Sequence, residues 1–438
     1  MKKFYLTAFL ALLVSGMARS TTWKELSIGE SFALADARNA DIVVARNAVD
    51  VAGQQVKVAR TGHLPQIDVS LSLSYLGDGT ILDRDFGNAR RDELPHFSNT
   101  LNVELYQPLF AGGAITGAVD LARKQEELAG IGLDAARNSI RMEVVRNYLD
   151  LSKYRNLLKV YEENIELTRK LLEEMRTRHA CGVVLKNDIT RYELKLSSLD
   201  YDRLEIENAI RVCNHNLVSL LGLDPDTEIR TTVDSEHADS ADSGADTWLQ
   251  SAYTHSDELK SVGAEYDLSA ISRRIARAEY FPKIGLVIAD NLLGPVTFEV
   301  PALNKNYNAW FVGVNLRWNI SSLFTTGRSV RKIKMEMEHN ALRRQAVEQK
   351  LGRRITDANT LYRQSQERLG IERKNVQLAD ENYDVVSNRF DKQLALLTDM
   401  LDASNARLDA GVRLVNAEIS TLFYYYQLHF ITGTLPEL

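Results

Sequence analysis

The sequence predicts an α+β protein in which very long helices alternate with a few amphipathic strands. Only 8 prolines and 24 glycines interrupt 438 residues, which favours long helices over many short strands. Similar motifs recur at a nearly constant spacing, which indicates two tandem structural repeats. Hydrophobic residues make up 45% and charged residues 26%, and this balance excludes both a disordered chain and a membrane protein with many apolar helices. The net charge of -6 gives no reason to expect nucleic acid as a partner.

The first segment, 1–20, has the layout of a secretory signal peptide. Lys2 and Lys3 precede an apolar stretch that ends near Val14, and small residues follow it. The apolar stretch is shorter than the ~20 residues that a membrane-spanning helix needs, so an uncleaved anchor is the less favoured alternative. We therefore expect an exported chain.

Two halves, 21–230 and 248–438, carry the same landmarks in the same order. Pro65 in the first half corresponds to Pro282 in the second, and Gly222 corresponds to Gly433 at a similar spacing. Matched punctuation of this kind indicates a duplication. Between the halves, the acidic and small residues of 231–247 predict a linker without a core.

Each half is expected to contain a helix, two strands, a very long helix, a tight turn and a last helix. The helices are predicted over 30–62, 115–181, 187–222, 246–281, 327–391 and 398–433. Each long helix would extend about 100 Å and each shorter one about half as far, so two shorter helices stacked end to end match one long helix. Heptad stripes, such as the one from Leu401 to Tyr426, supply the lateral packing of a coiled coil.

Period-two alternation predicts four strands and no other sheet. Apolar and polar residues alternate from 67 to 75, and the pattern returns at 101–105, 284–288 and 310–318. Four strands leave two unpaired edges, and their apolar face could meet lipid only in a closed barrel, which requires several chains. Tyr75, Trp310 and Trp318 suit the aromatic girdle of such a barrel. A periplasmic protein with a small capped sheet is the alternative.

Taken together, these landmarks resemble the TolC-like outer-membrane efflux family, the outer membrane factors. The resemblance rests on the Leu-Pro or Phe-Pro pair before each first strand, on 107–113 after the second strand, and on the segments 182–188 and 396–403. It implies a homotrimer in which each chain gives four strands to a twelve-stranded outer-membrane β-barrel. A long periplasmic coiled-coil barrel of helices would continue it as a tunnel.

The family resemblance also implies a function. Its members are passive exit ducts of tripartite efflux pumps and type I secretion systems in the outer membrane of Gram-negative bacteria. The implied partners are a periplasmic adaptor (membrane fusion protein), an inner-membrane transporter and outer-membrane lipid. A non-conducting structural coiled-coil protein that spans the periplasm is the alternative function.

Asp399 and Asp402 match the acidic pair that lines the family's tunnel at its periplasmic tip. Their spacing of three places both carboxylates on one helical face. In a trimer, six carboxylates would surround one axis and select cations at rest, and mutual repulsion would favour widening when a partner docks. The alternative is that Asp399 only caps its helix while Asp402 is solvated.

Apolar residues at the two helical turns are the expected docking surface for the adaptor, since apolar residues at an exposed tip need a partner. These residues are Gly182, Val183, Val184, Leu185, Leu394, Leu396 and Leu397. The alternative is that they close the trimer's own tip. Gln393 stands where the family has a second turn glycine, at a left-handed position that would cost about 1 kcal/mol. That turn therefore has either another geometry or a strained residue.

Catalytic and metal-binding motifs are not found in the sequence, so neither enzyme activity nor a cofactor is expected. Cys181 and Cys213 lie too far apart along the predicted helices to form a disulfide. The exported substrate is not predicted, because the wall of a water-filled tube records little of the chemistry of its cargo.

Overall fold

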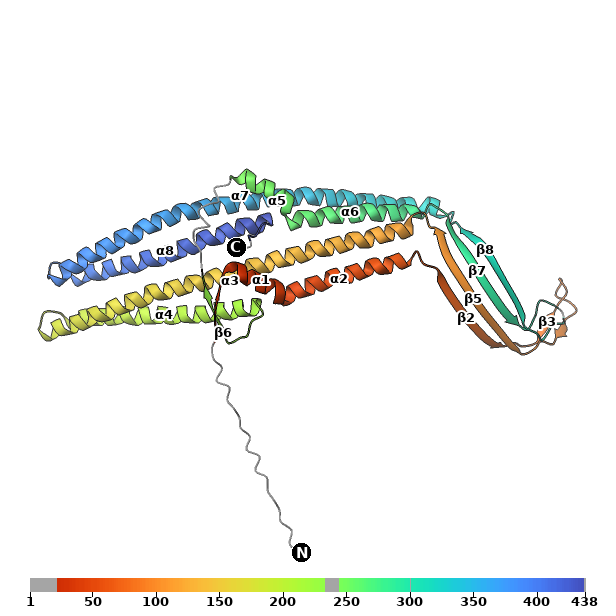
Figure 1. Ribbon diagram of the computed structural model, residues 1–438, viewed down its shortest axis with the longest axis horizontal. Helices are drawn as coiled ribbons and strands as arrows, with labels where there is room; N and C mark the ends of the chain where they lie inside the picture. Colours follow the sequence, from red (N-terminus) through yellow and green to blue (C-terminus); the bar gives the residue numbers. More distant parts are fainter. Residues whose placement is uncertain (1–21, 233–243, 300, 437–438) are drawn as a thin grey trace, which may run out of the picture. The chain divides into compact units, whose positions relative to one another are not determined.

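The computed structural model describes residues 22–232, 244–299 and 301–436 (Figure 1). The predicted signal peptide, 1–20, and most of the predicted linker lie outside these residues. The chain divides into two compact units, each made of separate stretches of sequence. The helical unit comprises Met1–Val43, Ala136–His255 and Gly352–Leu438, and the sheet unit comprises Val44–Ala135 and Ser256–Leu351.

One antiparallel sheet of four strands forms the end of the sheet unit (Figure 1). Its strands are β2 (Gln66–Tyr75), β5 (Phe97–Phe110), β7 (Lys283–Gly294) and β8 (Tyr307–Arg317), in the order β2-β5-β7-β8. All four were predicted from their alternation, which confirms the period-two reading. The central pair joins the two halves of the sequence, since β5 pairs with β7, and β2 and β8 form the edges.

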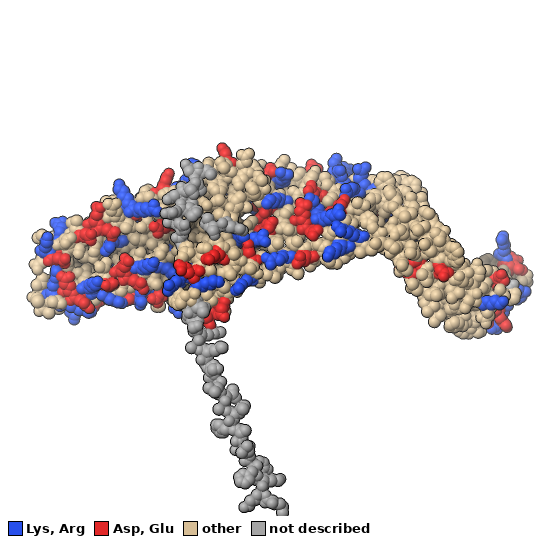
Figure 2. All heavy atoms as spheres, viewed as in Figure 1, with Lys and Arg blue, Asp and Glu red and all other residues tan. Residues whose placement is uncertain are grey.

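The alternation of the sequence gives the sheet an apolar face. Along β2, the apolar residues from Ile67 to Tyr75 are 59 to 77% exposed, and they alternate with Asp68 and serines. Figure 2 shows few charged side chains over these strands, whereas Lys, Arg, Asp and Glu are interspersed over the helices. An exposed apolar surface of this kind needs a covering medium or partner.

Four helical segments pack beside one another in the sheet unit: α2 (Ala40–Thr61), the first part of α3 (Ala114–Ala180), α6 (Asp257–Ala278) and the first part of α7 (Ser322–Asp391). Cross-helix ion pairs accompany this packing, with Lys124 of α3 3.2 Å from Asp267 of α6. Gly117 permits close approach of the same two helices, because a Cβ there would lie 2.7 Å from the side chain of Ile275.

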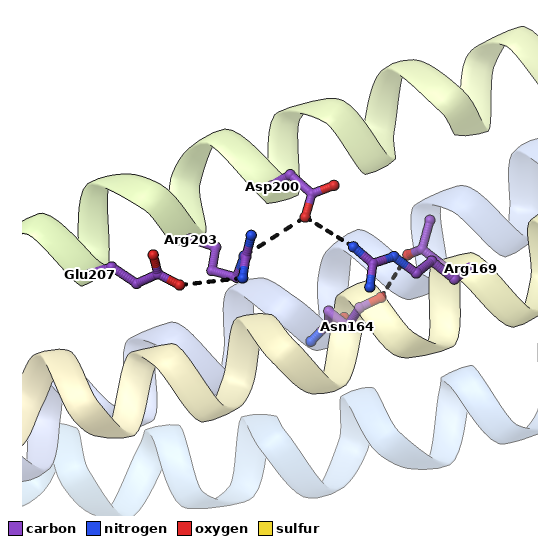
Figure 3. A network of polar contacts seen from close by, with 6 residues as sticks. Asn164, Arg169, Asp200, Arg203 and Glu207 are labelled. Carbon is purple, nitrogen blue, oxygen red and sulfur yellow. Dashed lines mark hydrogen bonds and ion pairs between the residues drawn. The ribbon is translucent and has the colours of Figure 1, made fainter.

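The helical unit contains α1 (Ile28–Arg38), α4 (Lys186–Leu220), α5 (Ala245–His255), α8 (Leu397–Thr432) and the remaining parts of α3 and α7. Leu157 of α3, Ile206 of α4 and Val415 of α8 form one of its buried clusters. Figure 3 shows the polar edge of the α3–α4 contact, where Arg169 reaches across to Asp200 at 3.2 Å and Arg203 lies 3.7 Å from the same carboxylate.

The predicted absence of any other sheet is wrong. β1 (Thr22–Leu26) pairs in parallel with β6 (Thr227–Thr231), and β3 (Gly79–Ile81) pairs with β4 (Arg90–Asp92) in the segment between β2 and β5. The β1–β6 pair is fixed to α3 by Tyr148, whose buried hydroxyl lies 2.8 Å from the carbonyl oxygens of Leu26 and Thr232. Burial raises the pKa of this phenol to about 12.

Two predicted helices are each divided by a break. The segment predicted as 30–62 consists of α1 and α2, and the segment 246–281 consists of α5 and α6. Asn39 explains the first break, because its Oδ1 accepts the N–H of Asp41 at the start of α2, while its Nδ2 donates to the carbonyl of Leu220. Ser256 lies between α5 and α6. The described helices include none whose length and apolar content would allow it to cross a lipid bilayer.

Candidate functional site: the helical tips and the strand face

The turn from α3 to α4 and the turn from α7 to α8 have the same backbone geometry. In the first, Gly182 has a φ of 77°, and its N–H and that of Val183 donate to carbonyls in the last turn of α3. In the second, Gln393 has a φ of 63° and, with Leu394, makes the same pair of bonds to α7. Both are Schellman motifs. Of the two alternatives left by the sequence, the glutamine therefore accepts the strained conformation.

The apolar residues of the two turns divide into two classes. Four of them are 59 to 71% exposed: Val183, Leu185, Leu394 and Leu396. They occupy equivalent positions, since one residue of each pair follows the left-handed residue and the other is the N-cap of the next helix. Val184 and Leu397 instead pack against a buried cluster. The exposed four are thus the candidates for contact with a partner.

The buried cluster behind the turns joins helices from both. It consists of Leu172 and Met175 of α3 with Ile189 and Tyr192 of α4, and Leu397 and Leu401 of α8 pack against it. The hydroxyl of Tyr192 is buried and has no hydrogen-bond partner among the described residues, and burial raises its pKa. Because residues of both turns pack on this cluster, a change in packing at one turn can alter the packing of the other.

Arg178 provides a polar link between the ends of the two long helices. Its guanidinium lies 3.7 Å from the carboxylate of Asp391 and stands over the ring of Phe390, 5.2 Å from the centroid. It also pairs with Glu174 on its own helix. The C-terminal ends of α3 and α7 are therefore held together by charge and by cation–π contact.

Asp399 and Asp402 lie in the first two turns of α8, and both are exposed within the single chain. The Oδ2 of Asp399 accepts the N–H of Leu396 at 2.9 Å, so this carboxylate does cap its helix. Its other oxygen has no protein hydrogen bond among the described residues, and Asp402 has neither a hydrogen bond nor an ion pair there. Capping therefore occupies only part of the acidic pair.

Sequence patterns did not draw attention to Lys195. Its Nζ donates to Ser404 Oγ at 2.6 Å and so connects α4 with α8 near the turns. Ion pairs to this lysine do not occur within the described chain, and burial lowers its pKa to about 8. A half-buried lysine in a heptad-like stretch gives no distinctive sequence signal, which explains why it was missed.

Of the predicted girdle residues, Tyr75 and Trp318 lie at opposite ends of the sheet, while Trp310 is the fourth residue of β8 and pairs with Asp290 of β7. Tyr75, at the end of β2, is 77% exposed and stacks on His96, and Trp310 is 73% exposed in the first half of β8. Trp318 follows β8 directly, and its indole N–H donates to the carbonyl of Tyr280 just after α6. Further exposed aromatic residues lie at the two ends of the sheet and were not predicted as girdle residues: Phe97 and Tyr307 at the loop end, and Phe110, Phe281 and Phe324 at the helix end. Their position at strand ends was the available signal.

Groups of three or more His, Cys, Asp or Glu side chains able to hold a metal ion are absent from the described part of the chain. The arrangement instead offers surfaces: apolar residues at the tips, a lone acidic pair beside them, and an apolar strand face with aromatic ends.

Known proteins share both the sequence pattern and the fold. The model of the family "Outer membrane efflux protein" matches residues 33–223 and again 248–434. The chain is 27% identical over 283 residues to the fusaric acid resistance protein FusA of Burkholderia cepacia, which covers 60% of this chain and 50% of that protein. It is 24% identical over 196 residues to the outer membrane protein TolC of Escherichia coli, which covers 41% of this chain and 39% of that protein. The chain thus spans half or less of the length of these curated relatives.

Solved structures extend the likeness over nearly the whole chain. The outer membrane protein VceC of Vibrio cholerae superposes with a TM-score of 0.76 at 16% identity, covering 93% of this chain and 96% of that one. The open-state outer membrane channel MtrE of Neisseria gonorrhoeae gives a TM-score of 0.72 at 15% identity, covering 94% and 90%. At these identities the likeness establishes the α+β fold. With the family match over most of its length, the chain belongs to the outer membrane efflux protein family.

Proposed function

We propose that the protein is the outer-membrane exit duct of a tripartite efflux pump or a type I secretion system. The observation that carries the proposal is the four-stranded sheet, whose apolar face is exposed and whose edge strands β2 and β8 have no partner within the described chain. Lipid accepts such strands only when every edge is paired, so further copies must complete the barrel.

Three copies would give the twelve-stranded barrel that the family resemblance implies. A strand of ten residues is about 34 Å long, and at a tilt of about 45° it crosses roughly 24 Å, close to the apolar band of outer-membrane barrels. The aromatic residues at both ends of the sheet would form the two girdles, with Tyr75 and Trp310 outward and Trp318 towards the helices. Two matches to one family model support the proposed duplication.

The long helices would continue the barrel as a periplasmic tunnel that is gated at the turns. In the trimer, Asp399 and Asp402 would gather six carboxylates around the axis. The exposed residues Val183, Leu185, Leu394 and Leu396 would meet the helical hairpins of a periplasmic adaptor, which links the duct to an inner-membrane transporter. Gly182 would give the first turn its shape, while Val184 and Leu397 would support this surface from the buried side.

The names of two relatives point to two classes of cargo, small molecules and proteins. One relative is described as a fusaric acid resistance protein and another, 25% identical over 181 residues, as the alkaline protease secretion protein AprF of Pseudomonas aeruginosa. Both small-molecule efflux and protein secretion therefore remain within the proposed function.

The test is conductance of the detergent-extracted protein in planar lipid bilayers, with its oligomeric state measured by light scattering. We expect a trimer that conducts and is blocked by multivalent cations from the side of the turns. Changing Asp402→Asn and Asp399→Asn together should weaken that block, since the acidic ring attracts cations. Unchanged block would remove the acidic gate alone, whereas a folded monomer without conductance in the periplasmic fraction would overturn the duct itself and favour the structural coiled-coil alternative.

A further inference from the structure

A groove between α3 and α8 in the helical unit forms a cavity of about 350 Å³. Its lining comes from two stretches of these neighbouring helices, around Leu149 and around Ile419, both of which are buried. A volume of this size lies at the lower end of pockets that hold small molecules. Neither the turns nor the strand face uses this groove.

One wall of the groove is aromatic. Phe423 and Tyr424 of α8 are half-buried and line it, with their ring centroids 5.7 Å apart and their ring planes inclined at 67°. With the buried Leu149 and Ile419, they supply an apolar surface that a flat ring can cover in stacked or edge-to-face geometry. This wall favours an aromatic or similarly flat ligand over a purely polar one.

Positive charge lies beside this aromatic wall, since the guanidinium of Arg146 on α3 stands over the ring of Phe423. The guanidinium of Arg146 lies 6.0 Å from the centroid of the Phe423 ring, and it has no ion pair within the described residues. Lys153, also in the lining, is paired with Asp150 at 2.9 Å. The lining therefore has one positive charge in excess, that of Arg146. Its planar guanidinium can form two parallel hydrogen bonds to a carboxylate.

We propose that this groove binds small aromatic carboxylates, with the ring against Phe423 and Tyr424 and the carboxylate on Arg146. A neutral aromatic compound would lose the ion pair, an aromatic amine would be repelled, and inorganic phosphate would leave the apolar wall uncovered. All residues of the site come from a single chain, so a test of ligand binding there is independent of whether a trimer conducts ions.

The test is isothermal titration calorimetry of the detergent-extracted full-length protein with benzoate, corrected with micelles alone. We expect saturable binding at one site per chain, with benzyl alcohol, benzylamine and phosphate binding at least about tenfold more weakly, because charged hydrogen bonds contribute strongly. Arg146→Gln should weaken benzoate binding about tenfold, and Phe423→Leu several-fold, as expected for a lost aromatic contact.

Two variants serve as controls. Arg146→Lys keeps the charge but loses the fork, so its affinity should fall between those of the wild type and Arg146→Gln. Lys159→Gln removes an exposed cation of α3 outside the groove and should bind benzoate as the wild type does. The proposal is overturned if benzoate gives no saturable heat, if benzyl alcohol binds equally well, or if a folded Arg146→Gln protein keeps full affinity.

Discussion

Gln393 holds a backbone conformation that glycine adopts freely and that other L-residues adopt at a cost of about 1 kcal/mol. The same hydrogen-bond pattern closes α3 at Gly182, α4 at Gly222 and α8 at Gly433. Because only α7 ends on a side chain with a Cβ, the turn from α7 to α8 is the strained one of the four. The strain lies beside Leu394 and Leu396, at the proposed contact surface.

Replacing Gln393→Gly should relieve this strain. We expect the opening free energy of the turn to rise by about 1 kcal/mol, which slows hydrogen exchange of the Leu394 amide about fivefold. The matched change Gly182→Gln should speed exchange of the Val183 amide by a similar factor. Equal exchange rates in Gln393→Gly and the wild type would show that the glutamine is not strained.

At the level of single residues, the sequence indicated which residues belong to the candidate site better than it indicated whether each side chain is exposed or buried. The turn residues and the acidic pair were named from the family resemblance, and their roles stay predictions, while exposed aromatic residues such as Phe97 and Phe324 were missed. The sequence could not separate the exposed Leu396 from Leu397, which packs on the buried cluster, because adjacent leucines differ only in the direction they take from the helix start. The capping bond of Asp399 was foreseen as an alternative, and it coexists with a free oxygen.

Among the elements, the long helices were predicted to within a few residues. α3 begins at Ala114 and ends at Ala180, against the predicted 115–181, because a run without proline and with regular apolar spacing has few other solutions. The break at Asn39 was missed although its capping bond to Asp41 is local, and the second bond of its side chain, to Leu220, joins residues far apart in the sequence. The β1–β6 pair was not predicted either, because its two strands are far apart in the sequence and each has only 5 residues, too few to show a clear alternation.

The contact between α4 and α8 is expected to depend on pH through Lys195. Its pKa is near 10.5 in the unfolded chain and about 8 in the folded one, so the folded state binds this proton more weakly. The destabilisation is therefore fully present below pH 8 and disappears as the pH rises towards 10.5. NMR titration of ¹³C-methylated lysines should show one resonance that titrates near pH 8 and is lost in Lys195→Met.

Two comparisons make this assignment specific. Lys195→Met should increase hydrogen-exchange protection in α4 and α8 at pH 7, because it removes a half-buried charge that has no carboxylate partner. Lys186→Met, which changes an exposed lysine at the start of α4, should leave protection unchanged. A Lys195 resonance that titrates near 10.5 would contradict the expectation.

For the whole molecule, a lysine is expected to have opposite effects on membrane insertion on the two faces of β2. In a lipid-facing barrel, Val69→Lys places a charge in the apolar band and should cost about 2–4 kcal/mol, lowering the amount of protein in the outer-membrane fraction. Ser70→Lys changes the neighbouring residue on the other face, which would line water, and should insert normally. Both residues are exposed in the single chain, so a difference between them reports on the surroundings rather than on the fold. Equal insertion of the two variants would contradict a lipid-facing barrel.

The pairing of β5 with β7 has a further consequence for biogenesis. Of the four-stranded sheet, the first half of the polypeptide can make only the β2–β5 pair, and the edge that β5 offers remains open until residues 283–294 have been synthesised. Contacts between segments so distant along the chain form slowly, and an open apolar hairpin is prone to aggregate while it waits. The newly made chain is thus expected to require a chaperone that covers the β2–β5 hairpin until β7 pairs with β5.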